Sequence, residues 1–377
     1  MSAFKIRIIQ PTILEYRVGL YAGLAKRYGN RMEIWAAEKD GVDVSVPLNG
    51  INTDYTHSFI HIGPLLWQKR LSLKGLSKGD VLVICSDIHN LSVMLLALRA
   101  KTKGVRVVCW GHHWTAGGRM WRVKIRLMIA KAISDVYLCY TKTGIDFLCR
   151  LGFDGTRVFA TGNTIDQIPI GKATGHWNDE NLRLFKEECG ISGKVLLLVC
   201  GVLRPKMRLH QLIEAIADKR LMDRDIMVAI IGDGVEKERN VALARQLKVE
   251  DKVIWVGATR DQEVMAPWFL SATAFVYPGA IGLSILHSMS YGLPVVVHGN
   301  KEHQMPEFEV MEDGLTGILF EENSVDDLAR KILWICENVE SIKKMKDYCR
   351  NKAWNEYTMD QMVANYAGAI ECAAKCE

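Results

Sequence analysis

Short apolar runs alternate with helix-length segments along the whole chain, and this alternation limits the possible fold more than any other feature. Near-continuous apolar strands joined by helical crossovers are typical of a parallel sheet covered on both faces. The pattern therefore predicts an α/β fold, with helices over 18–28, 91–103 and 120–133 in the first half. The expected strands lie at 5–10, 32–38, 81–86, 105–111, 136–141 and 158–162, and then at 194–201, 225–232, 252–257, 274–279 and 293–298.

A polar segment, DQIPIGKATGHWN at 166–178, separates the two series of strands. At 377 residues the chain is long enough for two domains. We expect two Rossmann-like, doubly wound parallel-sheet domains that face each other across a cleft, because open α/β sheets bind ligands at the carboxyl ends of their strands. The expected boundaries are 1–168 for the first domain, 169–180 for a linker, 181–355 for the second domain and 356–377 for a C-terminal helix that crosses back to the first domain.

Composition argues against several other classes of protein. No apolar run reaches ~18 residues, so no transmembrane helix is expected, and the first residues lack the pattern of a signal peptide. The ten cysteines form no CxxC pair and no Cys/His quartet, so we expect reduced core thiols and a cytoplasmic protein. A net charge of +5 is too small to indicate nucleic-acid binding.

Three expected strands of the second half end in glycine-containing turns. These turns are CGVLRPKMR at 200–208, IIGDGVEKE at 230–238 and VYPGAIGL at 276–283. Glycine lets a backbone approach a ligand closely, and the free N–H groups at the start of a following helix bind phosphate. Each turn alone equally fits a tight connection between strand and helix. Three of them beside Arg204, Lys206 and Arg208 favour an anion site.

The order of these segments resembles family 4 of the GT-B glycosyltransferases, retaining enzymes of bacterial polysaccharide, O-antigen and capsule biosynthesis. That family carries G-R-L-x-x-x-K-G, a GDG turn, V-G at a strand end, E-G-F-G-L-x-x-L-E-A-M-A-x-G-x-P-V-V and D-G-x-T-G. The corresponding segments here are GVLRPKMR, IIGDGVEKE, WVGATRDQEV, GAIGLSILHSMSYGLPVV and EDGLTGILF, which together span nearly all of 194–330. The resemblance implies donor binding by Gly201, Arg204, Lys206, Arg208, Gly232, Gly234, Gly257, Gly279, Ile281, Gly282, Leu283 and His287.

The chain departs from this family pattern at four positions. The family's two glutamates, which contact the donor sugar and the ribose, fall on Gly279 and His287. Its arginine and lysine, which brace the diphosphate, fall on Val202 and Met207. His287 can hydrogen-bond a ribose because imidazole both donates and accepts, and it equally fits a core position on a helix. A subset of bacterial polysaccharide transferases that resemble this chain carries a histidine there, followed by QMPEFE, which lies here at 304–309.

The first half carries further candidates near its expected strand ends. The segment from Tyr16 and Arg17 resembles the first turn of such transferases and places both residues on the acceptor side, although a helix cap and a surface arginine are the alternative. His112 and His113 follow a strand, and one of the pair is a candidate catalytic residue that contacts the transferred sugar or the donor phosphate. A satisfied loop histidine is the alternative. No Asp, Glu or Cys partner lies at metal-ligand spacing, so no metal site is expected.

A basic stretch, RMWRVKIRLMIAKAI at 119–133, alternates cations with apolar residues. We expect Trp121, Arg122, Lys124 and Arg126 to face an anionic membrane. The same apolar positions also suit simple packing on the sheet, and both readings remain open at this point.

These features predict a metal-independent hexosyltransferase without a cofactor. It would move a sugar from a UDP- or GDP-sugar to a lipid-linked or oligosaccharide acceptor, with retention of configuration, in the synthesis of cell-surface polysaccharide or lipopolysaccharide. We expect it in the cytoplasm, peripheral on the inner leaflet of the cytoplasmic membrane. A non-catalytic nucleotide-binding or partner subunit is the alternative that the missing Arg, Lys and Glu favour. A sugar-nucleotide epimerase would need the two carboxylates that are absent here.

Overall fold

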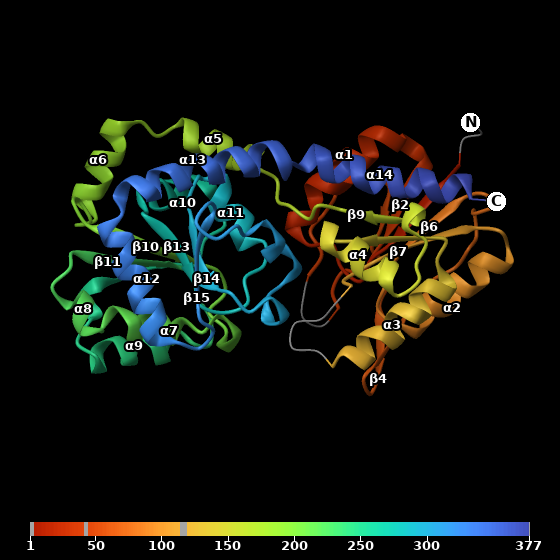
Figure 1. Ribbon diagram of the computed structural model, residues 1–377. Helices are drawn as coiled ribbons and strands as arrows, with labels where there is room; N and C mark the ends of the chain where they lie inside the picture. The colour runs from red at the N-terminus through yellow and green to blue at the C-terminus, as the bar shows by residue number, and fades with distance from the viewer. Residues whose placement is uncertain (1–3, 41–43, 114–118, 377) are drawn as a thin grey trace. The chain divides into compact units, whose positions relative to one another are not determined.

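Two parallel-sheet units make up the chain in the computed structural model (Figure 1), which describes residues 4–40, 44–113 and 119–376. The first unit runs to Ile165 and includes the C-terminal segment from Met359 onward. The second unit is Asp166–Thr358. The prediction of two Rossmann-like α/β domains is confirmed.

The first unit is built on a seven-stranded sheet in which every pair of neighbouring strands is parallel. Its order is β3-β2-β1-β6-β7-β8-β9, so the chain starts in the middle, winds to one edge and then returns to the other side. The strands are β1 (Ile6–Ile9), β2 (Met32–Trp35), β3 (Thr53–Asp54), β6 (Val81–Cys85), β7 (Arg106–Trp110), β8 (Val136–Cys139) and β9 (Val158–Ala160).

Helices cover both faces of this sheet, which explains why most residues of its central strands are apolar. Successive strand residues point to opposite faces. Val81 and Val83 therefore join one core cluster, and Leu82 and Ile84 join the other. The first cluster lies under α1 (Val18–Tyr28) and α14 (Met359–Lys375), and the second lies under α2 (Leu91–Thr102), α3 (Met120–Ile133) and α4 (Lys142–Arg150). The helix predicted to return to the first domain is thus α14.

The second unit has the strand order β12-β11-β10-β13-β14-β15, again with parallel neighbours. This is the doubly wound order 3-2-1-4-5-6, whose direction of winding reverses between its first and fourth strands. Here the reversal lies between β10 and β13, so a ligand is expected beyond the carboxyl ends of these two strands. The strands are β10 (Val195–Cys200), β11 (Ile226–Ile231), β12 (Val253–Gly257), β13 (Ala274–Tyr277), β14 (Val295–His298) and β15 (Gly317–Phe320).

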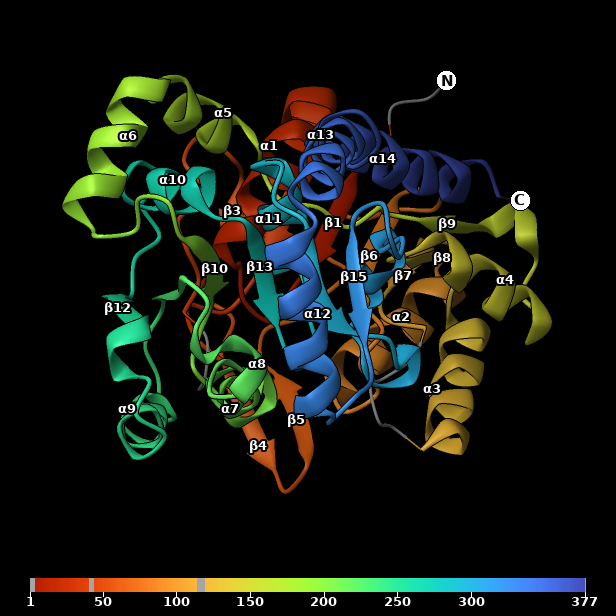
Figure 2. The same cartoon turned by 60° about the vertical axis from the view of Figure 1, so that its left-hand side comes forward.

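The helices of the second unit pack in two groups. One group contains α7 (Leu209–Ile216), α8 (Lys219–Met222), α9 (Lys237–Gln246) and α12 (Val325–Glu337), and Figure 2 shows α12 in front of the sheet. The other contains α5 (Ile168–Gly175), α6 (Asp179–Glu188), α10 (Gln262–Ser271), α11 (Ser284–Ser290) and α13 (Val339–Glu356).

The segment expected to be a linker, 169–180, is instead largely helical. It forms most of α5 and the start of α6, and α5 packs against α10 within the second unit. Pro169 stands in the first turn, where its missing N–H costs no hydrogen bond. Gly171 lies against Trp354, because a methyl group built on Gly171 would come within 2.9 Å of that ring.

A small hairpin of β4 (Phe59–Ile62) and β5 (Leu65–Gln68) was not predicted, and it projects from the first unit in Figure 2. Its side chains are largely exposed, with Ile60, Ile62 and Trp67 among the large apolar residues that face solvent. Within residues 4–40, 44–113 and 119–376, no helix is long and apolar enough to cross a bilayer.

Candidate functional site

Four strand ends of the second unit carry glycines that were predicted to bind the donor, and three of these glycines lie in the predicted glycine turns. Gly201 follows β10, Gly232 follows β11, Gly257 ends β12 and Gly279 follows β13, all at the carboxyl edge. Because β10 and β13 are neighbours at the point where the winding reverses, Gly201 and Gly279 begin the two loops that flank the expected ligand position.

These loops lie against one another at backbone distance. A methyl group built on Gly232 would lie 2.0 Å from the carbonyl oxygen of Gly201, and one built on Gly279 would lie 1.9 Å from that of Lys206. A methyl group on Gly234 would lie 2.4 Å from the carbonyl oxygen of Leu203. The close approach of loop to loop therefore accounts for these three glycines, independently of any ligand.

Gly282 is different, because a methyl group built there would have no neighbour closer than 3.8 Å. The preceding residue, Ile281, is fixed by its N–H, which donates to Oε1 of Gln304 at 2.8 Å. Nε2 of Gln304 donates in turn to the carbonyl oxygen of His298 at 2.9 Å. Leu283 then leads into α11. The loop 279–283 is thus held by a fully buried glutamine, while Gly282 has room for a methyl group in van der Waals contact with Met305 and Glu307.

The basic residues beside the β10 turn are placed in different ways. Arg204 and Lys206 are exposed, on either side of Pro205 in the short η4 helix (Pro205–Met207). Met207, which stands where the family has a lysine, is fully buried. A methyl group built on Gly201 would lie 3.0 Å from its Cε, so the side chain tucks against the β10 turn.

Arg208 is held by an ion pair. Its Nη1 lies 2.8 Å from Oε1 of Glu322, and its φ of 56° is in the left-handed region that disfavours side chains. Although burial opposes ionisation of Glu322, hydrogen bonds from His303, Arg208 and Asn300 lower the pKa of this carboxyl to about 2. Arg208 is therefore committed to Glu322, and Arg204 and Lys206 are the exposed cations of this turn.

His287 lies on α11 and faces α10. Its Nε2 is 3.1 Å from Oε1 of Gln262, which also accepts from the Tyr291 hydroxyl at 2.7 Å. Burial lowers the pKa of His287 to about 4, so the ring is neutral at pH 7. Since Oε1 can only accept, the proton of the neutral ring belongs on Nε2. The Gln262 contact fits the core-histidine alternative, and a ribose contact stays a prediction.

The carboxyl edge of the first unit gathers polar and aromatic residues around Arg17. The guanidinium donates from Nη1 to Oδ1 of Asn163 at 3.1 Å and from Nη2 to the Tyr140 hydroxyl at 3.2 Å. Its Cζ also lies 4.2 Å from the centre of the Trp110 ring and 4.9 Å from that of Tyr16. Arg17 is thus buried and fixed rather than a surface arginine, whereas Tyr16 is exposed.

The two adjacent histidines have different surroundings. The His112 ring stacks on Tyr140 at 4.3 Å between centres. Burial, aided by Arg126 and Arg17, lowers the pKa of His112 to about 4. The His113 ring is buried over Gly144, where a methyl group would come within 2.7 Å of its Nδ1. His112 is therefore the member of the pair that joins the Arg17 cluster.

The residues predicted to face a membrane are mostly exposed on α3. Trp121, Arg122 and Lys124 all face solvent. Arg126 differs, because it is partly buried and its Nη2 donates to the carbonyl oxygen of His112 at 2.8 Å. Its guanidinium braces the loop after β7 rather than extending from the surface.

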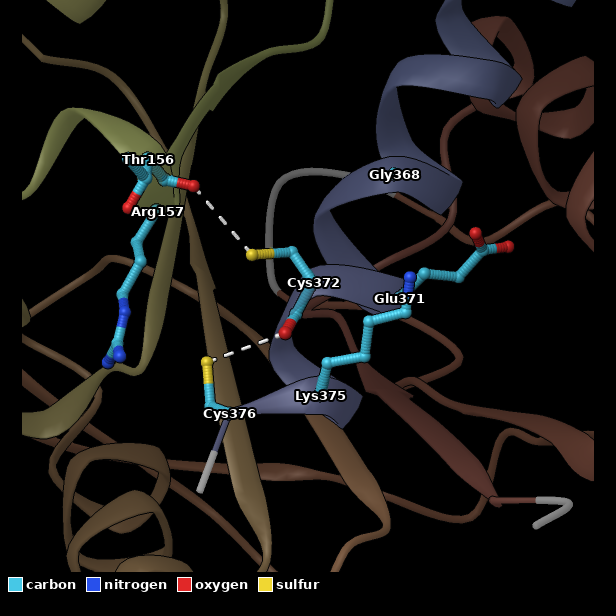
Figure 3. A pocket seen from close by; sticks show the side chains of 7 residues that line it. All are labelled: Thr156, Arg157, Gly368, Glu371, Cys372, Lys375 and Cys376. Atoms are coloured by element: carbon cyan, nitrogen blue, oxygen red, sulfur yellow. Dashed lines mark hydrogen bonds between the residues drawn. The ribbon is translucent and has the colours of Figure 1, made fainter. Parts of the chain in front are cut away.

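A surface cavity of about 590 Å³ lies elsewhere in the first unit (Figure 3). Its lining includes Thr156 and Arg157, which precede β9, so the cavity is at the amino-terminal edge of the sheet. The Cys372 thiol donates to the Thr156 carbonyl oxygen at 3.8 Å, and the Cys376 thiol to that of Cys372 at 3.4 Å. Across the described part of the chain, His, Cys, Asp and Glu side chains form no group of three that could hold a metal ion.

Comparison with known proteins finds a family model that matches part of this chain. Residues 183–352 match the family model "Glycosyl transferases group 1". Over 182 residues, 48% of the chain, it is 24% identical to the N-acetyl-alpha-D-glucosaminyl L-malate synthase of Bacillus anthracis. Over 102 residues, 26% of the chain, it is 29% identical to the lipopolysaccharide 1,6-galactosyltransferase of Salmonella typhimurium. These alignments cover 46% and 28% of the two relatives, so the chain spans less than half the length of either.

Solved structures match nearly the whole chain. HepE of Anabaena, crystallised with UDP, aligns over 97% of this chain and 98% of its own, with a TM-score of 0.71 and 14% identity. A glycosyltransferase from Rickettsia africae aligns over 100% of both chains, with a TM-score of 0.74 and 14% identity. Residues 183–352 therefore match the glycosyl transferases group 1 model, and nearly the whole chain has the fold of these two solved structures.

Proposed function

We propose that this protein transfers a sugar from a nucleoside-diphosphate sugar to a lipid-linked or oligosaccharide acceptor. The observation that carries the proposal is the set of glycine turns at the carboxyl edge of the second sheet, where the winding reverses between β10 and β13. The exposed cations Arg204 and Lys206 stand on the first of these turns. Backbone N–H groups and nearby cations suit a diphosphate. UDP in the structure of HepE adds support for a uridine nucleotide.

The proposed chemistry is stabilisation of the departing nucleoside diphosphate. As the glycosidic bond breaks, negative charge grows on the β-phosphate, and fixed N–H groups and cations around it lower the barrier. We assign no nucleophile and propose that no metal is needed and that configuration is retained. His112, neutral at pH 7 beside Arg17, is the first-unit residue proposed to contact the transferred sugar or the donor phosphate.

The test is a thermal-shift screen with UDP, GDP, UDP-glucose, UDP-galactose and GDP-mannose, followed by a nucleotide-release assay with lipid-linked acceptors. A ligand that binds only the folded chain raises its melting temperature by mass action. We expect one base to be preferred, and its sugar conjugate to release nucleotide once an acceptor is present. No shift at millimolar ligand, together with no release, would exclude a transferase.

A non-catalytic partner subunit is the second candidate, favoured by one specific observation. Val202 and Met207 stand where the family has its diphosphate-bracing cations, and Met207 is turned into the core. Nucleotide binding without any sugar-dependent release, across donors and acceptors, would support this alternative.

We further propose a peripheral contact with an anionic membrane in cell-surface polysaccharide synthesis. On α3, Trp121 is 55% exposed and Ile125 49%, and Arg122 and Lys124 lie between them. On the packed neighbour α2, Leu95 and Leu98 are also exposed. Apolar side chains interspersed with cations suit the interface of an anionic bilayer.

Vesicle sedimentation tests the membrane contact. We expect binding to vesicles that contain phosphatidylglycerol and little binding to pure phosphatidylcholine. The double variant Trp121→Glu and Ile125→Glu should lose binding. Val235→Glu, at an apolar site of the second unit that is even more exposed (82%), should retain it. Equal binding by all three proteins would exclude α3 as the contact.

A further inference from the structure

Glu307 places a carboxylate beside the loop that we propose holds the donor. It lies on the short η7 helix (Pro306–Val310), which packs against α11. The residue is only 6% exposed. Its Oε2 would lie 3.9 Å from a methyl group built on Gly282. A carboxylate from a neighbouring segment thus lies beside Gly282, the glycine of this loop where a methyl group would fit without a clash.

The backbone around Glu307 is fixed on both sides. Before it, Gln304 is fully buried and joins the N–H of Ile281 to the carbonyl oxygen of His298. After it, Phe308 and Val310 are buried in the core. Glu307 therefore does not depend on a flexible loop for its position, and a preorganised carboxylate forms hydrogen bonds at little entropic cost.

The loop itself cannot supply a carboxylate near its first glycine. A methyl group at Gly279 would meet the Lys206 carbonyl oxygen at 1.9 Å, so no side chain can extend from that position in this backbone. Gly282, by contrast, has room for a methyl group in ordinary van der Waals contact, and Glu307 reaches this point from the neighbouring segment. Carboxylates are strong acceptors for hydroxyl donors, and their two oxygens can accept from adjacent hydroxyl groups.

We propose that Glu307 binds hydroxyl groups of the sugar in the nucleotide-sugar donor. This inference rests on the proposed function and adds a specificity-determining residue to it. Gln304 acts as a positioning residue, because it sets the loop and the start of the Glu307 segment together. The ligand class is a donor with free sugar hydroxyls, and the nucleoside diphosphate alone does not use Glu307.

Calorimetric titration of wild type and variants with UDP, GDP, UDP-glucose, UDP-galactose and GDP-mannose tests the inference. Glu307→Gln keeps the shape and removes the charge. The variant should bind the preferred nucleotide sugar with an affinity about tenfold to a hundredfold lower than wild type. This is the usual effect of losing hydrogen bonds to a charged group. The affinity for the matching free nucleotide should stay within about twofold. Glu309→Gln, two residues further on, is the matched control and should bind both ligands as wild type does.

Other outcomes separate the two proposals. If Glu307→Gln binds the nucleotide sugar as tightly as wild type, the inference about Glu307 is overturned and the proposed function stands. The same holds if the variant loses affinity equally for the nucleotide sugar and the free nucleotide. If Glu309→Gln loses as much affinity for the nucleotide sugar as Glu307→Gln does, the effect comes from the net negative charge of this segment. That result overturns the inference as well. If Glu307→Gln does not fold, Glu307→Asp carries the test, because it keeps the charge but shortens the reach. A wild-type chain that binds no ligand of the panel refutes the proposed function, and this inference with it.

Discussion

Replacing Gly279 by alanine tests the loop geometry most directly. The added methyl group would lie 1.9 Å from the carbonyl oxygen of Lys206 and 2.9 Å from the carbonyl carbons of Lys206 and Met207. A carbon–oxygen contact needs about 3.4 Å, so the two loops must part by roughly 1.5 Å. Both sides of the contact are backbone and neither can rotate away. We expect a loss of about 3 kcal/mol, at the upper end for overpacking.

Gly282→Ala is the matched control on the same loop. Its φ is outside the left-handed region and its nearest neighbours would be 3.8 Å or more away. The free energy of unfolding should therefore change by less than about 1 kcal/mol, and the smaller entropy of the unfolded chain can even raise it.

Urea denaturation and calorimetry measure both variants. At about 2–4 °C per kcal/mol for a unit of this size, Gly279→Ala should melt roughly 6–12 °C below wild type, and Gly282→Ala close to it. Equal melting temperatures for Gly279→Ala and wild type, or an equal loss in both variants, would refute the close approach of the two loops.

Three further predictions concern titration, strain and burial. Burial lowers the pKa of both His287 and His298 to about 4. Their contribution to stability is thus present above pH ~6.5 and is lost as the pH falls toward 4. The urea midpoint of wild type should therefore be lower at pH 5 than at pH 7.5, and this difference should be smaller for His298→Leu. Arg208→Ala loses the Glu322 ion pair and keeps a strained φ of 56°, so it should be about 1 kcal/mol less stable than Arg208→Gly in the same assay. Met207→Lys puts a charge at a fully buried position and should cost about 3 kcal/mol in calorimetry; an unchanged melting temperature would mean that the lysine reaches solvent.

Local sequence patterns predicted the sheets well and short or context-dependent elements poorly. Long apolar runs gave the strands of both sheets apart from β3 and β15. The hairpin of β4 and β5 was missed because its strands are short and largely exposed, so they lack the apolar pattern of the others. The helix α5 was missed because Pro169, Gly171 and Gly175 are typical of a loop. Its stability comes from packing on α10 and Trp354, which no local pattern reveals.

The candidate site was likewise predictable only in part. Strand-ending glycines are visible in the sequence, so the turns at 201, 232, 257 and 279 were found. Their partners were not, because each contact joins positions far apart in the chain, as with Gly279 and Lys206. The segment QMPEFE was noticed through a resemblance alone. Only the fold shows that Gln304 holds the loop and that Glu307 lies beside Gly282.

The departures from the family pattern at Gly279 and Met207 belong to one local arrangement. The Lys206 carbonyl oxygen occupies the space into which a side chain at 279 would extend. The next residue, Met207, turns inward against Gly201, which leaves Arg204 and Lys206 exposed. A glycine at 279 follows from η4 lying close to the β13 loop, and an apolar residue at 207 follows from the burial of its side chain against the β10 turn. Restoring one family residue alone would conflict with this backbone, because the other side of the contact stays in place. We therefore propose that the charges facing the donor come from the exposed Arg204 and Lys206 for the diphosphate and from the buried Glu307 for the sugar.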